Sequence, residues 1–303
     1  MRKPNFDLIA IDLDGTLLGP DGLVSPANVK AVRAARRAGV EVVVCTGRAL
    51  VESTSAIRAI EGHVPAAGRN VAPMVCAGGA MVCDVASGRT LHRWAMRQNL
   101  VQRLCAHFAE VKRAPLLLKD RDAAGFDYLV VNSGPIEYPT QWWFQKMGVE
   151  VKFVDDPVHD AHPEHTVRVG FAAMTETMQS LAQSVKERFG REAVTQHFAA
   201  VAGTSQAPSG VKDEAVHLLE VFDPQVSKWT AVHRLALEQG IPRQRVAAIG
   251  DEINDLAMIE GAGLGIAMGN AVPMVKSAAR VETASHAADG VALAIDRILN
   301  GEW

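Results

Sequence analysis

Short apolar runs that end in glycine or polar residues recur along this chain, and they predict buried strands followed by loops. The first run, Leu8–Asp12, ends in carboxylates, and the second, Val40–Cys45, leads into Thr46-Gly47-Arg48. Between them, Ser25-Pro26 is typical of a helix start, with an N-cap followed by a proline at the first helical position. A strand, a helix and a second strand in this order predict a right-handed unit of a parallel sheet.

The middle of the chain has a different pattern, in which apolar segments alternate with helical stretches. Residues 175–189 predict an amphipathic helix with Met178, Leu181, Val185 and Phe189 on one face. The pattern therefore predicts a mixed α/β second domain, residues 86–223, inserted into a first domain formed by residues 1–85 and 224–303. Further elements are predicted as strands at 74–76, 80–84, 115–118, 128–131, 149–154, 167–171, 216–222, 246–249 and 263–268, a loop at Gly203–Gly210 and a helix at 227–239.

Asp12 and Asp14 follow the first strand directly, and they carry the most specific chemistry of the chain. Two carboxylates at the end of a buried strand repel each other unless something positive lies between them. Hard oxygen ligands of this kind suit Mg²⁺. The alternative is an ordinary polar exit from a strand.

Other polar groups at corresponding places favour a site over that alternative. Gly250-Asp251-Glu252-Ile253-Asn254-Asp255 follows another predicted strand, and Lys228 stands at a predicted helix start. In parallel α/β sheets, binding sites form outside the carboxyl ends of the strands. We therefore expect these residues to meet at one edge of a sheet.

Three stretches together resemble the haloacid dehalogenase superfamily of phosphohydrolases. They are Asp12-Leu13-Asp14-Gly15-Thr16, Gly250–Asp255 and Ala262–Ala271. The resemblance is strongest to the Cof-type branch, and it implies a Rossmann-like parallel-sheet core with an inserted α/β cap of the C2B type that determines substrate specificity. The two outer pieces of the chain carry these motifs, whereas the middle resembles the cap only in its general pattern.

The resemblance also implies catalytic roles. Asp12 would be the nucleophile that forms an aspartyl-phosphate, and Asp14 would protonate the leaving oxygen and later take a proton from water. The implied Mg²⁺ ligands are Asp12, Asp14 through its backbone carbonyl, Asp251 and Asp255. Asp255 could bind through water or support Asp251, since it lies four residues further on.

A second set of residues would bind the substrate. Thr46 and the Gly47 N–H would hold phosphate oxygens, and Lys228 would add a positive charge. Arg48 has two interpretations, because it could bind substrate or pair with a core carboxylate. The full implied set is Leu13, Thr46, Gly47, Arg48, Lys228 and Asn254.

Some positions depart from the branch. Gly78 stands where an asparagine is usual, and Trp229 stands where a glycine is usual, which predicts a large ring beside the phosphate-binding groups. Two further patterns are interpreted as structural. The glycines at 261, 263 and 265 lack dinucleotide-binding spacing, and the histidines at 159, 162 and 165 are interpreted as part of a solvated loop, not as a metal site.

Composition limits the remaining classes. The 303 residues suit two domains, and a formal charge of −3 gives no electrostatic case for nucleic acid or an anionic membrane. No apolar run approaches the roughly 20 residues of a membrane span. The early first strand leaves no room for a signal peptide, and the four cysteines show no metal-binding spacing, so we expect a cytoplasmic protein.

The sequence thus predicts a Mg²⁺-dependent phosphatase acting on a small phosphorylated metabolite, such as a sugar phosphate. A phosphomutase using the same aspartyl-phosphate is the nearest alternative. A non-catalytic protein that stores a phosphoryl group is a third, although Asp14 argues against it because stored phosphoryl needs no acid/base partner. Within the branch, sugar phosphates, pyridoxal phosphate, flavin mononucleotide and nucleotides are all substrates, and the oligomeric state stays open.

Overall fold

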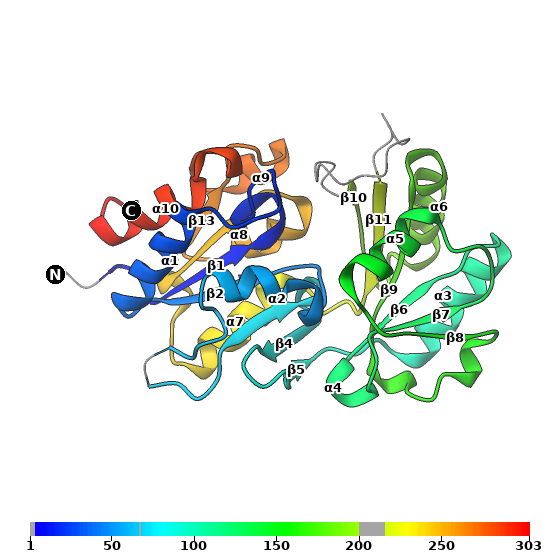
Figure 1. The fold of residues 1–303 in the computed structure, drawn as a ribbon. Helices are drawn as coiled ribbons and strands as arrows, with labels where there is room; N and C mark the ends of the chain where they lie inside the picture. The colour runs from blue at the N-terminus through cyan, green and yellow to red at the C-terminus, as the bar shows by residue number, and fades with distance from the viewer. Residues whose placement is uncertain (1–3, 67, 200–215) are drawn as a thin grey trace. The chain divides into compact units, whose positions relative to one another are not determined.

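The computed structural model of the chain describes residues 4–66, 68–199 and 216–303, and the predicted loop Gly203–Gly210 lies outside these ranges. The described chain divides into two compact units (Figure 1). The first contains residues 4–66, 68–91 and 227–303, and the second contains residues 92–199 and 216–226.

The first unit carries an eight-stranded sheet in the order β14-β13-β12-β1-β2-β3-β4-β5. Its strands are β1 (Leu8–Asp12), β2 (Glu41–Cys45), β3 (Pro73–Cys76), β4 (Met81–Asp84), β5 (Thr90–Arg93), β12 (Val246–Gly250), β13 (Leu264–Ala267) and β14 (Val281–Glu282). Neighbours from β14 to β3 pair in parallel, and β4 returns antiparallel to β3. The predicted parallel-sheet core is confirmed.

Helices pack against this sheet, with α1 against α10 and α7 against α8. Their bounds are α1 (Pro26–Arg37), α2 (Leu50–Ala59), α7 (Lys228–Glu238), α8 (Leu256–Gly261), α9 (Pro273–Ala278) and α10 (Gly290–Asn300). The N-cap predicted at Ser25 is present, and Ser227 caps α7 in the same way. The Ser25 hydroxyl accepts a hydrogen bond from the Asn28 N–H at 3.1 Å, and the Ser227 hydroxyl accepts one from the Thr230 N–H at 3.0 Å.

Strand β1 lies at the centre of the sheet, and this explains its continuous apolar run. It pairs with β2 on one side and with β12 on the other, and its five residues are all buried. Parallel strands end at the same edge, so the loops after β1, β2, β3 and β12 open side by side. These are the loops that carry the polar residues singled out in the sequence.

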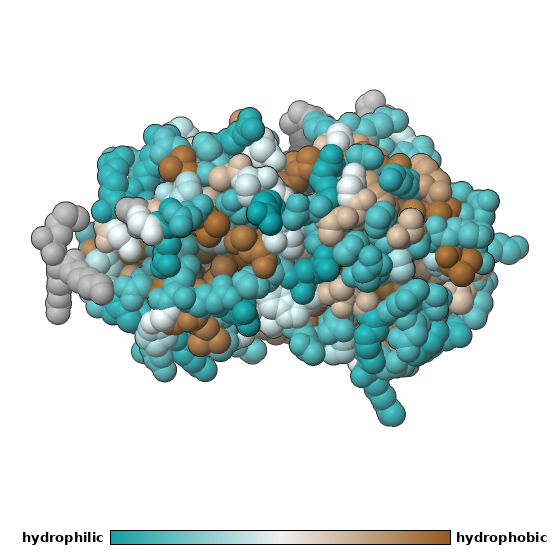
Figure 2. Space-filling view, turned by 90° about the horizontal axis from the view of Figure 1, so that it is seen from below, coloured by the Kyte–Doolittle hydropathy of each residue, from teal (hydrophilic) through white to brown (hydrophobic). Residues whose placement is uncertain are grey.

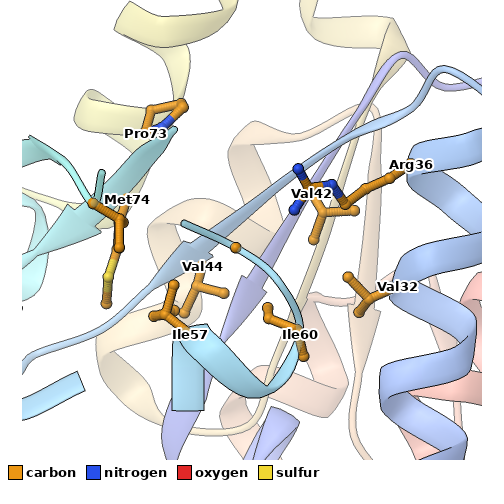
Figure 3. Close-up of a pocket in the computed structure, with 10 residues that line it drawn as sticks. Val32, Arg36, Val42, Val44, Ile57, Ile60, Pro73 and Met74 are labelled. Atoms are coloured by element: carbon orange, nitrogen blue, oxygen red, sulfur yellow. The ribbon is translucent and has the colours of Figure 1, made fainter. Parts of the chain in front are cut away.

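A small apolar cavity lies between α1, α2 and the strands β2 and β3 (Figure 3). Its lining includes Val32, Val44, Ile57 and Met74, and its volume of about 10 Å³ is near the minimum for one water molecule. Arg36, also on the lining, donates from Nη1 to the Glu61 carbonyl at 2.6 Å and from Nη2 to the carbonyl of Val64. The cavity therefore has room for about one water molecule.

The second unit has a six-stranded sheet in the order β10-β11-β9-β6-β7-β8. All neighbours pair antiparallel except β7 and β8. Its elements are α3 (Gln98–Glu110), β6 (Leu116–Lys119), α4 (Arg121–Ala124), β7 (Tyr128–Val131), α5 (Tyr138–Met147), β8 (Val151–Val154), β9 (Thr166–Met174), α6 (Thr175–Phe189), β10 (Val194–Ala199) and β11 (Val216–Phe222).

The core of the second unit lies between α3, α6 and one face of this sheet. Met178, Leu181, Val185 and Phe189, the predicted apolar face of α6, are all buried there. The sheet contributes alternate residues, such as Val169 and Phe171 of β9, because successive side chains of a strand point to opposite faces. This core explains why the 175–189 pattern was predictive.

The surface, the helices and the thiols add three observations. Apolar side chains on the face shown in Figure 2 are scattered in small groups among hydrophilic residues. Among the described residues, none of the helices combines the length and apolarity of a membrane-spanning segment. All four cysteines are buried and form no disulfide.

Candidate active site

Lys228 and Asp12 form the centre of the candidate site. Asp12 is the last residue of β1, and Lys228 is the first residue of α7. The Lys228 ammonium donates to Asp12 Oδ1 at 2.5 Å and to Asp255 Oδ1 at 2.6 Å, and the lysine has no exposed surface. A cation at a helix start opposes the helix dipole, so these two carboxylates hold it there.

Asp255 organises the loop after β12. Its Oδ2 accepts from the backbone N–H of Asp251 at 3.0 Å and of Glu252 at 3.1 Å. With Lys228 on Oδ1, both oxygens of this buried carboxylate are engaged. Of the two roles expected for Asp255, these contacts correspond to supporting Asp251.

Asp251 is held by two residues that received no role from the sequence. Thr16 donates from Oγ1 to Asp251 Oδ1 at 2.8 Å, and Asn270 donates from Nδ2 to Asp251 Oδ2 at 3.1 Å and to the Gly15 carbonyl at 2.9 Å. In the sequence, Thr16 could have been found from its place in the first motif, and Asn270 from its place after β13.

Gly15 is required by the geometry of the turn after β1. Its φ is +75°, and a Cβ there would lie 2.4 Å from Asp251 Oδ2. Leu13, at the start of the same turn, is fully buried. The turn thus brings backbone groups and the Asp251 carboxylate close together.

Asp14 points to a different partner. Arg48 Nε donates to Asp14 Oδ2 at 2.9 Å, and Arg48 Nη2 donates to Asp14 Oδ1. Of the two interpretations of Arg48, the pairing with a core carboxylate is the one that the structure contains.

The loop after β2 is fixed by the loop after β3. The Gly78 N–H donates to the Thr46 carbonyl at 2.9 Å, and the Arg48 N–H donates to Thr46 Oγ1 at 3.1 Å. The buried Thr46 hydroxyl therefore keeps its own proton for another acceptor. Gly47 lies between these anchored residues.

Asn254, in the loop after β12, accepts from Lys228 Nζ at 3.4 Å.

The electrostatics of the site follow from an excess of buried negative charge. Burial and the neighbouring Asp255 raise the pKa of Asp12 well above its usual range, although Lys228 opposes this. Burial, with Asp255, also raises the pKa of Asp251 to about 7. Burial would lower the pKa of Lys228, but Asp12 and Asp255 outweigh it and raise that pKa. Lys228 therefore stays charged, and the excess charge on the carboxylates needs a proton or another cation.

Asp12, Asp251 and Asp255 can each offer a carboxylate oxygen within 4.8 Å of the others, which is a spacing that a metal ion could bridge. Oxygen donors of this kind suit a hard divalent cation. Asp14 is outside this group as a side chain. This acidic cluster is the candidate place for a divalent metal.

Three sequence features outside the site have structural partners. The Trp229 ring stacks on His233 with centroids 5.1 Å apart, and a Cβ at Gly261 would lie 2.3 Å from the ring. The ring of Trp229 therefore packs between α7 and α8. Gly263 and Gly265 also meet backbone closely, at Gln244 and Ile259, which fits their structural interpretation.

Of the three histidines predicted in a solvated loop, His159 is exposed, whereas the other two are not. His162 and His165 are half-buried and their rings stack with centroids 6.0 Å apart. Their nitrogens and the Glu164 carboxylate can approach within 4.8 Å of one another. His165 Nε2 is 3.0 Å from Glu164 Oε1.

Comparison with known proteins identifies the family. A family model described as haloacid dehalogenase-like hydrolase matches residues 9–295. The chain belongs to this family. The predictions of the family, of the α/β fold and of a hydrolase are confirmed.

Relatives and solved structures agree with this assignment. Phosphatase YwpJ of Bacillus subtilis is 32% identical over 311 residues, covering 96% of this chain and 99% of YwpJ. The 5-amino-6-(5-phospho-D-ribitylamino)uracil phosphatase YwtE of Bacillus subtilis is 29% identical, covering 97% of this chain and 99% of YwtE. A crystal structure of a haloacid dehalogenase-like hydrolase from Bacteroides thetaiotaomicron shares the fold, with a TM-score of 0.73 at 23% identity over 97% of this chain and 99% of that one.

Proposed function

We propose that this protein is a Mg²⁺-dependent phosphatase that hydrolyses a small phosphomonoester through an aspartyl-phosphate on Asp12. The observation that carries the proposal is the buried cluster of Asp12, Asp251 and Asp255, in which the Lys228 ammonium pairs with Asp12 and Asp255. Such a surplus of buried carboxylates is costly in a purely structural site, and it suits a site that receives a cation together with its substrate.

The residues that would hold Mg²⁺ are Asp12, Asp251 and the backbone carbonyl of Asp14, with Asp255 fixing the loop of Asp251. When bound, the metal neutralises charge on the phosphoryl group and lets an anionic nucleophile approach it. The donor set fits, because it consists of oxygens. This chain's own contribution is to keep the carboxylates together before the substrate arrives.

Two chemical steps would then follow. An oxygen of Asp12 attacks phosphorus, the bond from phosphorus to the ester oxygen breaks, and Asp14 gives its proton to that oxygen. Water then attacks phosphorus, Asp14 takes a proton from it, and the bond to Asp12 breaks to release phosphate.

Phosphate recognition is assigned to donors around Asp12. The Thr46 hydroxyl, the Gly47 N–H, the Asn254 amide and Lys228 would bind the phosphoryl oxygens, and the Leu13 backbone borders them. Because Thr46 is buried and is contacted by the Arg48 N–H of its own loop and by the Gly78 N–H of the loop after β3, its hydroxyl is held in place in advance.

The substrate is proposed as a phosphorylated sugar or polyol, or a similar small metabolite. YwtE, which aligns along almost the full chain, is named for a phosphorylated ribityl compound. We assign substrate selection to the inserted cap, predicted at 86–223. The four free buried thiols fit a reducing compartment, and we propose the cytoplasm.

The test is phosphate release from a panel of phosphorylated metabolites with Mg²⁺, with chelator and with Asp12→Asn. Asp296→Asn, an exposed carboxylate of α10, is the matched control. Turnover that is lost with chelator and in Asp12→Asn, but kept in Asp296→Asn, is the expected result. A folded wild-type protein that becomes phosphorylated and releases no phosphate would refute hydrolysis and favour a mutase or a phosphoryl-storing role.

A further inference from the structure

The guanidinium of Arg48 donates two hydrogen bonds to the carboxylate of Asp14. Nε donates to Oδ2 at 2.9 Å and Nη2 donates to Oδ1, so the planar fork meets both carboxylate oxygens. A two-point contact of this kind fixes the rotation of a carboxylate as well as its position. Lysine could not reproduce it, since an ammonium is a point charge.

The arginine itself is anchored. Its N–H donates to Thr46 Oγ1 at 3.1 Å, its carbonyl accepts from the Ala77 N–H at 2.9 Å, and Nη1 donates to the Glu52 carbonyl at 3.3 Å. These contacts link Arg48 to its own loop, to the loop after β3 and to α2. The guanidinium therefore has a fixed base from which to orient Asp14.

Asp14 needs such a support. It lies in the turn after β1 with φ −83° and ψ 123°, next to Gly15 in a left-handed conformation. Its side chain is 37% exposed, whereas that of Arg48 is 23% exposed. A carboxylate that is exposed to this degree samples several rotamers unless a partner holds it. It is also outside the group formed by Asp12, Asp251 and Asp255.

We propose that Arg48 is a positioning residue that acts through Asp14, holding its carboxyl group where it meets the leaving oxygen. This inference rests on the proposed function. It excludes the other interpretation of Arg48, in which the guanidinium binds the phosphoryl group directly. The two roles predict a different dependence of kcat/KM on the leaving group. The proton supplied by Asp14 matters only when the departing alcohol must be protonated, whereas binding of the phosphoryl group is the same for every ester.

The experiment measures kcat/KM for two esters in wild type, Arg48→Met, Arg48→Lys, Asp14→Asn and Arg48→Met/Asp14→Asn. One ester has an alkyl leaving group that must be protonated, and the other is 2,4-dinitrophenyl phosphate, whose phenolate leaves without a proton. kcat/KM is chosen because it excludes the later hydrolysis of the phosphoenzyme. Arg297→Met, an exposed arginine of α10 paired with Glu302, is the matched control.

We expect Arg48→Met and Asp14→Asn each to lower kcat/KM for the alkyl ester by about 10² or more, and for the dinitrophenyl ester by less than about tenfold. Arg48→Lys falls between wild type and Arg48→Met. The double variant matches Asp14→Asn, because removing the support of a missing group has no further effect.

Equal losses for both esters in Arg48→Met, or additive losses in the double variant, would overturn the inference while leaving the proposed function intact. Unchanged activity in Arg48→Met would do the same. A wild type that hydrolyses neither ester nor any metabolite would instead refute the proposed function, so the two failures are distinct.

Discussion

Two lysines among the described residues are fully buried, and the difference between their surroundings separates a chemical site from a structural one. Lys228 contacts Asp12 and Asp255, with Asp251 close by, so negative charge exceeds positive. Lys119, in the second unit, pairs with a single carboxylate, that of Asp160, and donates to Thr166 Oγ1 at 2.7 Å.

The pKa values of the two lysines shift in opposite directions. Burial lowers the pKa of Lys119, and its one carboxylate does not fully compensate. Burial acts in the same sense on Lys228, but Asp12 and Asp255 reverse it. The balanced ion pair of Lys119 and Asp160 connects a loop to a strand. The carboxylates around Lys228 exceed its charge, so they can bind a further cation.

The largest expected effects come from replacing each lysine by methionine. Lys228→Met should lower turnover by more than about 10³, because a fixed charge beside the phosphoryl group is lost. Lys119→Met should keep the turnover per folded molecule but lose about 3–5 kcal/mol of unfolding free energy, because Asp160 is left buried and unpaired. Steady-state kinetics and urea unfolding of both variants measure the contrast. Loss of activity in a folded Lys119→Met variant would contradict the contrast between the two lysines.

Replacing one carboxylate in each region sharpens the comparison. Wild type at a Mg²⁺ concentration of 100 times its Kd should gain about 2.7 kcal/mol of unfolding free energy, and Asp251→Asn should gain none. Without metal, Asp251→Asn should be less destabilised than Asp160→Asn, because it relieves repulsion among carboxylates. Thermal unfolding with Mg²⁺ and with chelator tests this. Equal Mg²⁺ stabilisation of Asp251→Asn and wild type would contradict the metal assignment.

The smallest effect concerns a polar pair with no carboxylate in it. His197 Nε2 lies 3.0 Å from His217 Nδ1 on β10 and β11, and burial, with His217, lowers the pKa of His197. As pH falls below about 6.5, the unfolded chain binds a proton here before the folded chain does, so unfolding free energy decreases. Above that pH the contribution of His197 to the free energy of unfolding is constant. His197→Gln should reduce the slope between pH 7 and the lowered pKa; an unchanged slope would show that other groups cause it.

The sequence predicted the site where parallel-sheet geometry alone brings residues together. Asp12, Thr46 and Asp251 follow neighbouring strands, so their meeting at one edge follows from strand order. The helix caps at Ser25 and Ser227 were equally local and equally predictable. The α6 face was predictable because its period matches that of a helix packed on one side.

Side-chain partners across long separations were not predictable. The contact of Arg48 with Asp14 depends on the direction in which both loops turn, and the contact of Asn270 with Asp251 depends on how β13 ends. The ring of Trp229 packs in the space that the missing Cβ of Gly261 on α8 provides, and no pattern within one helix indicates this contact. Each case is decided by packing between elements, which one strand or helix pattern does not contain.

The central claim is that Asp12 carries the phosphoryl group during turnover. The most direct test is an acid quench within the first turnover of a substrate found in the panel, followed by peptide mass spectrometry. The account predicts one phosphoryl group on the peptide that contains Asp12, absent from Asp12→Asn and lost as turnover completes. A fully active Asp12→Asn, or a phosphoryl group on another residue, would contradict it.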